Sequence, residues 1–306
     1  MRQKSLTVLF SFFFVFFAFL SCQSSPERPE EALIEGGYVP LEPGASAYIV
    51  VNAEQAKPIL EQLNLDFAQN KQFQQMLDRT NFAIAAVYPS ASPQQFQISA
   101  WGKYPASIAN MSMSAKNGWS KIRSPETGKQ YRYSDQNSLS IVLNAKQAFI
   151  AGGGKPVYPV AAKPGAAIPE AFGVFSKNAI LSCWFDDPAP MINVTLMELK
   201  IPVEMPAEKL FISVFPAGDA SEGRYEAFLR VEVATATQAR ALAAVMSLAG
   251  AFIPRDTASE IKRGSALLTA VFFENPPVNE GSILTIKTGL LKPQEIALLF
   301  NMFSVK

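Results

Sequence analysis

Histidine is absent from this sequence of 306 residues. Without an imidazole side chain, the protein cannot build a Ser-His-Asp or Cys-His catalytic group, or a zinc site with histidine ligands. The side chain that usually changes its charge near neutral pH is missing as well. An enzyme with this composition would therefore have to use other groups, such as carboxylates.

Cysteine is nearly absent, with Cys22 and Cys183 as the two examples. Cys183 lies in the apolar run ILSCWF, residues 180–185. Apolar neighbours on both sides predict a buried strand residue rather than a reactive or intermolecular thiol.

An excess of charge of either sign is also lacking, with 27 Lys and Arg against 26 Asp and Glu. No cluster of lysine and arginine stands out along the sequence. Nucleic acid is therefore not expected as a partner, because its phosphate backbone requires a basic surface. The sequence also shows no polybasic stretch that would bind anionic lipid.

The N-terminus carries a long apolar run. Arg2 and Lys4 precede fifteen mostly apolar residues, 6–20. A helix that spans a membrane needs about 20 apolar residues, so this run is too short to span comfortably. A short positive segment followed by such a run is typical of a secretory signal peptide. The sequence therefore predicts a signal peptide over residues 1–21.

The end of this run, Phe19-Leu20-Ser21-Cys22, resembles the lipobox of bacterial lipoproteins. Its relaxed form is similar to the lipoboxes of spirochaetes and Bacteroidota. The resemblance implies that Cys22 becomes the lipid-modified N-terminus, and two or three acyl chains anchor a protein stably to a membrane. Gln23 after the cysteine implies the outer membrane, with the periplasmic or the surface face left open. The alternative is an ordinary signal peptide cleaved nearby, with an unmodified Cys22.

Composition divides the mature chain into four segments. Residues 22–45 are rich in proline, glutamate, glycine and serine, which predicts a flexible tether between lipid and fold. Residues 46–151 and 171–306 carry the patterning of two folded α+β repeats. The stretch 152–170 is rich in proline and glycine and is the natural linker between them.

Similar strand-like segments recur in the two halves in the same order. At separations of 127–133 positions, the pairs are 48–52 with 181–185, 82–89 with 210–216, 96–104 with 225–233, and 138–144 with 266–272. Each half predicts strand, helix, strand, strand, helix and a terminal hairpin. This order predicts an α+β fold of two tandem ferredoxin-like (β-α-β-β-α-β) repeats with antiparallel sheets. The alternative is a chance match between segments of ordinary strand composition.

Helix signals fall at the expected places between these strands. The sequence predicts helices that begin near Pro105, near Thr235 or Thr237, and near Pro293. The second of these helices carries an apolar face that consists of Ala239, Leu242, Val245, Met246 and Ala249.

Two short motifs suggest an acyl-enzyme. Ser259 and Lys262 fit S-x-x-K, and Lys287-Thr288-Gly289 fits K-T-G, which resemble motifs of penicillin-binding proteins and serine β-lactamases. Those families hold the two motifs far apart around a large helical insert, whereas 28 positions separate them here. We therefore interpret Lys287 as an ordinary strand residue and Ser259 as part of a polar turn.

Asp186 and Asp187 form the one pair of adjacent aspartates that follows a predicted strand. Paired carboxylates can bind a metal or share a proton. No calcium-binding loop surrounds this pair, and Pro188 follows it directly. The pattern favours a turn or a helix cap over a metal or catalytic site.

Three tryptophans, Trp101, Trp119 and Trp184, are the remaining candidates for a ligand groove. Trp101 alternates within a predicted strand and Trp184 lies in an apolar one, which favours core packing instead.

The sequence thus predicts no catalytic, metal or cofactor site, and it favours a non-enzymatic, lipid-anchored protein of the cell envelope. We expect this protein to act by binding or scaffolding. The partner is left open between an envelope protein, an envelope polymer and a small ligand. The alternative is a histidine-free envelope hydrolase that uses carboxylates such as Asp186 and Asp187.

Overall fold

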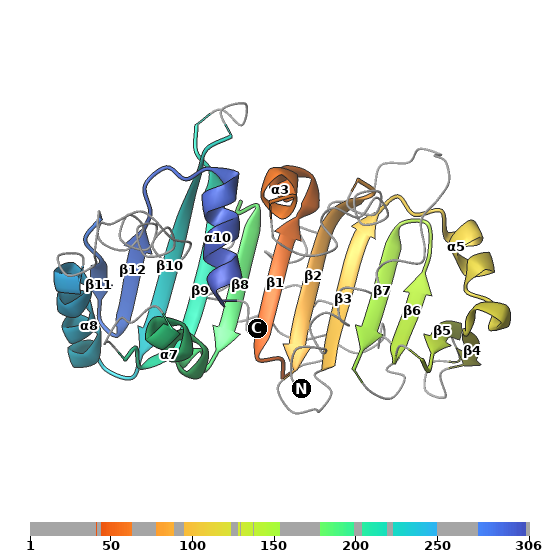
Figure 1. Cartoon of the computed structure of the whole chain (residues 1–306), viewed down its shortest axis with the longest axis horizontal. Coiled ribbons are helices and arrows are strands. Elements are labelled where there is room, and N and C mark those ends of the chain that lie inside the picture. Colours follow the sequence, from red (N-terminus) through yellow and green to blue (C-terminus); the bar gives the residue numbers. More distant parts are fainter. Residues whose placement is uncertain are drawn as a thin grey trace. The chain divides into compact units, whose positions relative to one another are not determined.

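The computed structural model describes residues 41, 44–62, 78–88, 95–123, 128, 130–136, 138–153, 178–198, 204–218, 223–249 and 275–303. The chain forms two compact units, residues 1–57 with 65–177 and residues 58–64 with 178–306. Both units are mixed α+β structures in which antiparallel strands predominate (Figure 1). No helix within the described ranges is long and apolar enough to span a membrane.

The first unit is built on an antiparallel sheet with the strand order β1-β2-β3-β7-β6-β5-β4. Its strands are β1 (Ala47–Asn52), β2 (Thr80–Tyr88), β3 (Gln95–Gly102), β4 (Ser120–Arg123), β5 (Gln130–Ser134), β6 (Leu139–Leu143) and β7 (Gln147–Gly152). Helix α3 (Ala53–Leu60) follows β1, and α5 (Ala106–Ser112) with the short 3₁₀ helix η2 (Ala115–Asn117) follows β3.

One face of this sheet packs against the segment that contains α5. Strands β3 and β7 direct alternate side chains to this face, as the period of two requires. The buried core on this side consists of Phe96, Ala100, Tyr104, Ala109, Met113, Trp119, Leu139, Ile141, Ala148 and Ile150. The alternation that predicted a strand near 96–104 is therefore the pattern that builds this core.

The opposite face of β2, β3 and β7 is also buried, and it carries polar side chains that pair with one another. Tyr88 Oη donates a hydrogen bond to Gln97 Oε1 at 3.2 Å. Gln147 Nε2 donates to Ser99 Oγ at 3.1 Å. These partners allow the polar groups to be buried without leaving their hydrogen-bonding capacity unused.

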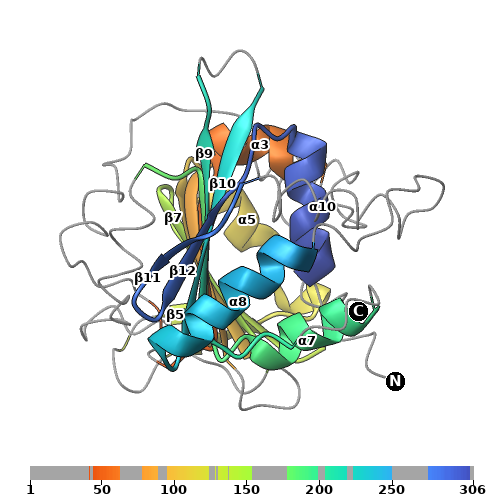
Figure 2. The same ribbon diagram turned by 90° about the vertical axis from the view of Figure 1, so that its left-hand side faces the viewer.

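The second unit has the strand order β8-β9-β10-β12-β11, again antiparallel. Its strands are β8 (Leu181–Asp186), β9 (Ala207–Pro216), β10 (Tyr225–Val233), β11 (Val278–Glu280) and β12 (Ile283–Lys287). Its helices are α7 (Ala189–Glu198), α8 (Ala236–Ala249) and α10 (Pro293–Phe303). Figure 2 shows all three helices on the same side of this sheet.

Local signals explain where the helices of this unit begin. The Gln238 N–H donates to Thr235 Oγ1 at 3.2 Å, so Thr235 caps α8 as predicted. Helix α10 begins at Pro293, also as predicted. The Lys292 N–H donates to the Glu295 carboxylate at 2.7 Å, which satisfies one backbone group at that end.

The apolar face of α8 is narrower than the sequence predicted. Ala239, Leu242 and Met246 are buried against the sheet. Val245 is 39 % exposed, because it lies at the margin of the stripe rather than at its centre. The side chain of Ala249 lies outside the described residues.

The predicted ferredoxin-like arrangement is not confirmed, because the strand order differs. A split β-α-β unit places another strand between the two strands that its helix connects. Here β1 pairs directly with β2, and β8 pairs directly with β9, both antiparallel. In each unit the first three strands form a meander, and the last strand of a terminal hairpin, β7 or β12, adds to the third. The same order of elements along the chain is compatible with both topologies.

Some of the segments predicted as repeats cannot be compared. Residues 138–144 contain β6, whereas their predicted counterpart, 266–272, lies outside the described residues. Most of the predicted linker, 154–170, also lies outside them. Gly152 ends β7, so this strand extends into the stretch that composition assigned to the linker.

Candidate functional site

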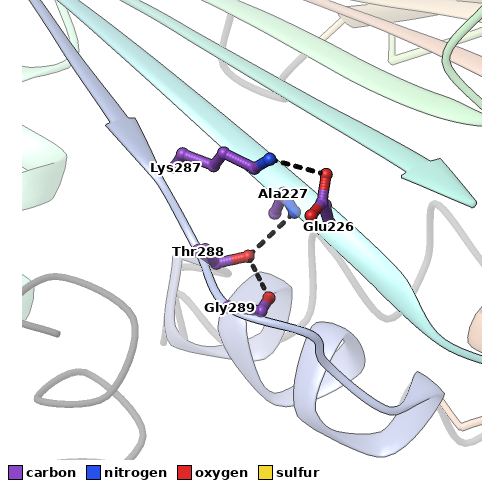
Figure 3. Close-up of polar contacts among 5 residues, drawn as sticks. All are labelled: Glu226, Ala227, Lys287, Thr288 and Gly289. Carbon is purple, nitrogen blue, oxygen red and sulfur yellow. Dashed lines mark hydrogen bonds and ion pairs between the residues drawn. The ribbon is translucent and has the colours of Figure 1, made fainter. Parts of the chain in front are cut away.

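The K-T-G motif lies where β12 ends beside β10 (Figure 3). Thr288 Oγ1 accepts a hydrogen bond from the Ala227 N–H at 2.9 Å and donates to the Gly289 carbonyl at 2.9 Å. The Thr288 N–H in turn donates to the Ala227 carbonyl at 2.9 Å. Thr288 is 1 % exposed. Its hydroxyl therefore fastens β12 to β10 and is not available to a substrate.

The ammonium group of Lys287, the residue before Thr288, contacts two side chains of β10. Its Nζ lies 3.0 Å from Glu226 Oε2 and 5.4 Å from the centre of the Phe228 ring. The side chain of Lys287 is 51 % exposed, so both contacts stabilise the strand pair only modestly. This confirms Lys287 as a strand residue. Ser259 and Lys262 lie outside the described residues.

Asp186 and Asp187 do not form a paired carboxylate site. Asp186 ends β8 and lies opposite Lys209 in the β8–β9 ladder. Asp187 has a φ of 48°, and its N–H donates to the Glu208 carbonyl at 2.8 Å. Both aspartates are exposed. They shape the turn between β8 and α7, as predicted. Among the residues with described positions, no group of three or more Cys, Asp or Glu could hold a metal ion.

The predicted buried strand residue Cys183 is confirmed. It is 2 % exposed on β8 and lies opposite Ile212. Burial without a charged neighbour raises the pKa of its thiol to about 12. The thiolate, which is the reactive form, is therefore nearly absent at neutral pH.

The tryptophans pack as structural residues. Trp119 and Trp184 are 4 % and 8 % exposed. Trp101 is half-buried, and its ring centre lies 5.7 Å from that of Phe82 on the neighbouring strand. These contacts favour the core role expected from the sequence over an open ligand groove.

A small apolar cavity lies between α10 and the sheet of the second unit. Its volume is about 10 Å³, and its lining consists of Ile212, Val214, Ala227, Leu229, Ile296, Leu299 and Phe300. This volume admits about one water molecule, and an apolar cavity lacks the polar partners that a water requires. The cavity is therefore a packing defect rather than a ligand site.

The structure assembles a cluster of cations that the linear sequence did not reveal. Lys121 on β4 lies directly opposite Arg132 on β5. Arg123 is two positions along β4 and therefore projects from the same face. We call these three residues the basic edge. No Lys/Arg cluster stands out along the sequence, and strand pairing brings these cations together from positions 9 to 11 apart.

Two helices, α5 and α7, each expose a pair of large apolar side chains. On α5, Met111 is 70 % exposed and Ile108 is 37 % exposed. On α7, Met197 is 71 % exposed and Val194 is 52 % exposed. Single exposed apolar residues are normal on soluble proteins, whereas apolar side chains that adjoin one another on a surface are features of interaction sites.

The comparison with known protein families gives a match in the first unit. Residues 39–155 match the family model described as "Outer membrane-associated lipoprotein TP0453". The first unit thus resembles this lipoprotein family. TP0453 is a protein of the spirochaete Treponema. No curated protein matches the sequence.

Three crystal forms of TP0453 share the fold. Form III matches with a TM-score of 0.57 and 13 % identity, and the match covers 92 % of this chain and 100 % of TP0453. Form I gives a TM-score of 0.55 at 13 % identity, with 92 % and 99 % covered. Form IV gives 0.56 at 12 % identity, with 87 % and 98 % covered. TM-scores above 0.5 show a common fold, and at this low identity the likeness shows the fold alone.

These matches confirm the resemblance to spirochaete-type lipoproteins that the lipobox indicated. The matched family is described as outer membrane-associated, which agrees with the localisation that the lipobox predicts.

Proposed function

We propose that this chain is a lipid-anchored protein of the outer membrane that acts by binding or scaffolding, without catalysis. Cys22 carries the lipid, residues 1–21 are removed, and residues 22–45 connect the lipid to the fold. The lipobox and the family match to an outer membrane-associated lipoprotein support this anchoring.

We further propose that the folded part arose from two related units, residues 46–151 and 171–306, joined by 152–170. Both units begin with a strand, a helix and two further strands in an antiparallel meander. Both then place a helix before a terminal hairpin whose second strand pairs with the third strand of the unit. This shared order supports a duplication whose topology is the observed meander rather than the ferredoxin-like order.

The observation that carries the binding role is the apolar exposure on α5 and α7. Met111 and Met197 each leave about seven-tenths of their surface in solvent. Methionine is flexible and polarisable, and it is common on surfaces that bind varied partners. By contrast, the hydroxyl of Thr288 and the carboxylates of Asp186 and Asp187 serve the fold or the solvent. Among the described residues, the exposed apolar side chains of α5 and α7 are therefore the features that support a binding role.

Photo-cross-linking in living cells tests this proposal. A photoreactive amino acid replaces Met111 or Met197, and the exposed helix residues Glu54 and Arg240 receive the same replacement as controls. We expect an adduct with an envelope component at one or both methionines and none at the controls. Equal adducts at all four positions, or none at either methionine, would contradict a binding role for these helices.

A further inference from the structure

The positive charges of the basic edge lie close together, and their mutual repulsion destabilises the sheet. Lys121 and Arg132 are direct partners in an antiparallel ladder, where like charges are destabilising. Lysine on an edge strand can guard against edge-to-edge aggregation, but that role does not require arginine on the inner strand β5. Glu126 and Lys129, which come between the two strands in the sequence, lie outside the described residues.

No carboxylate of the described residues neutralises these three cations. Arg123 Nε donates to the Gly128 carbonyl at 2.8 Å, and Arg132 Nη2 donates to the Asn110 carbonyl at 3.3 Å. The described part of residues 95–153 contains six Lys and Arg and a single acidic residue, Asp135. The described residues of the first unit therefore present uncompensated positive charge at this edge, which favours an anionic occupant.

The chain itself contains an acidic segment of matching length and charge. Glu27, Glu30, Glu31 and Glu35 occupy four of nine positions, against the single cation Arg28. We propose that the basic edge binds this stretch, residues 27–35, of the chain's own N-terminal segment. Because both parts belong to one chain, the acidic stretch is present at a high effective concentration near the edge. This inference goes beyond the proposed function and does not depend on the identity of any partner.

The acidic stretch is long enough to reach the basic edge. Six steps in the strand order separate β1 from β4, which is about 29 Å at ~4.8 Å per step. Glu35 and Glu27 precede Gly44 by 9 and 17 residues. An extended chain covers ~3.3 Å per residue, so these residues reach about 30–56 Å from Gly44.

The contact would control how far the fold stands from the membrane. With residues 27–35 on the basic edge, only residues 22–26 connect the lipid to the first unit. Five residues span at most about 17 Å, whereas the full segment to Gly44 spans about 70 Å. Because the attraction is electrostatic, salt or a competing anionic partner would release the acidic stretch and extend the tether.

Carbodiimide cross-linking of the full mature chain, produced from Cys22 onward without lipid, tests the contact. The reagent joins a glutamate to a lysine amine that it touches, and peptide mass spectrometry of the monomer identifies the pair. Lys121 is the reporter amine, and the exposed Lys103 and Lys146 in the same unit are references. At low salt we expect cross-links from residues 27–35 to favour Lys121 by about fivefold or more, and to lose this preference near about 0.5 M NaCl.

Charge reversal beside the reporter gives the matched comparison. Arg123→Glu should abolish the preference for Lys121, and Arg123→Gln should reduce it if the first variant fails to fold. Lys103→Glu makes the same change of charge outside the basic edge and should leave the preference intact. Equal cross-linking to all three lysines, no response to Arg123→Glu or Arg123→Gln, or cross-links confined to dimers would overturn the proposal.

Discussion

Phe96 on β3 lies directly opposite Gly152 on β7, and its ring occupies the space that a β-carbon of residue 152 would need. A Cβ built on Gly152 would lie 2.3 Å from Phe96 Cε1 and 2.5 Å from Phe96 Cζ. An aromatic ring over a strand glycine covers backbone that would otherwise be poorly packed. The last residue of β7 is therefore a glycine because of its neighbour across the ladder.

Gly152→Ala should consequently destabilise the first unit. The new methyl group would displace the Phe96 ring from the core, and overpacking of this kind costs ~1–3 kcal/mol. Urea denaturation measures the loss. Gly289→Ala is the control, because no atom lies within 4 Å of the added carbon, and its effect should stay within ~0.5 kcal/mol. A Gly152→Ala variant as stable as the parent would refute this packing role.

Thr288→Val tests whether the K-T-G motif is structural. Valine keeps the shape of threonine but leaves the buried Ala227 N–H without its acceptor, a loss of ~1–3 kcal/mol in the free energy of unfolding. Lys287→Ala removes a partly exposed ion pair and the contact with the Phe228 ring, and it should change the stability by about 1 kcal/mol or less. If Thr288→Val were neutral and Lys287→Ala severe, the hydrogen-bonding account of this motif would be wrong.

Stability should fall at alkaline pH because two buried groups resist ionisation. Burial raises the pKa of Cys183 from 9.0 to about 12, and that of Tyr104 from 10.0 to about 12. Between those values the unfolded chain loses protons that the folded chain keeps, so unfolding becomes easier as the pH rises. The contribution is complete below pH 9 and declines by up to ~1.4 kcal/mol per pH unit for each group.

Unfolding by urea at pH 8, 9.5 and 10.5 checks this dependence. Cys183→Ala is the control for the thiol, and its stability should decline less between pH 8 and 9.5. A free energy of unfolding that stays constant up to pH 10.5 would show that these groups ionise in the folded protein.

The strands themselves were predictable from the sequence. The segment 225–233 coincides with β10, and the segment 96–104 overlaps β3, because alternate apolar side chains must face one core. Pro105 directly precedes α5, and Pro293 opens α10, because proline is tolerated at the start of a helix. Each of these features depends on residues close together in the chain.

Strand neighbours and the basic edge could not be predicted in the same way. The direct pairing of β1 with β2 is determined by tertiary structure. It does not change the alternation of apolar side chains in either strand. Lys121 and Arg132 meet because of the β4–β5 register, and their spacing of 11 positions carries no signal. The pairing of strands, which leaves little signal in the sequence, therefore creates the charged surface of the first unit.

Acylation of Cys22 tests the account most directly. Cells that process lipoproteins are grown with a clickable fatty acid, and wild-type protein is compared with Cys22→Ala by labelling and by membrane fractionation. Because the leader ends at a lipobox, we expect the wild-type chain to carry the label and to sediment with the outer membrane. Cys22→Ala should be unlabelled and released from the membrane. Wild-type protein without label, or equal membrane retention of both chains, would contradict the lipid-anchored account.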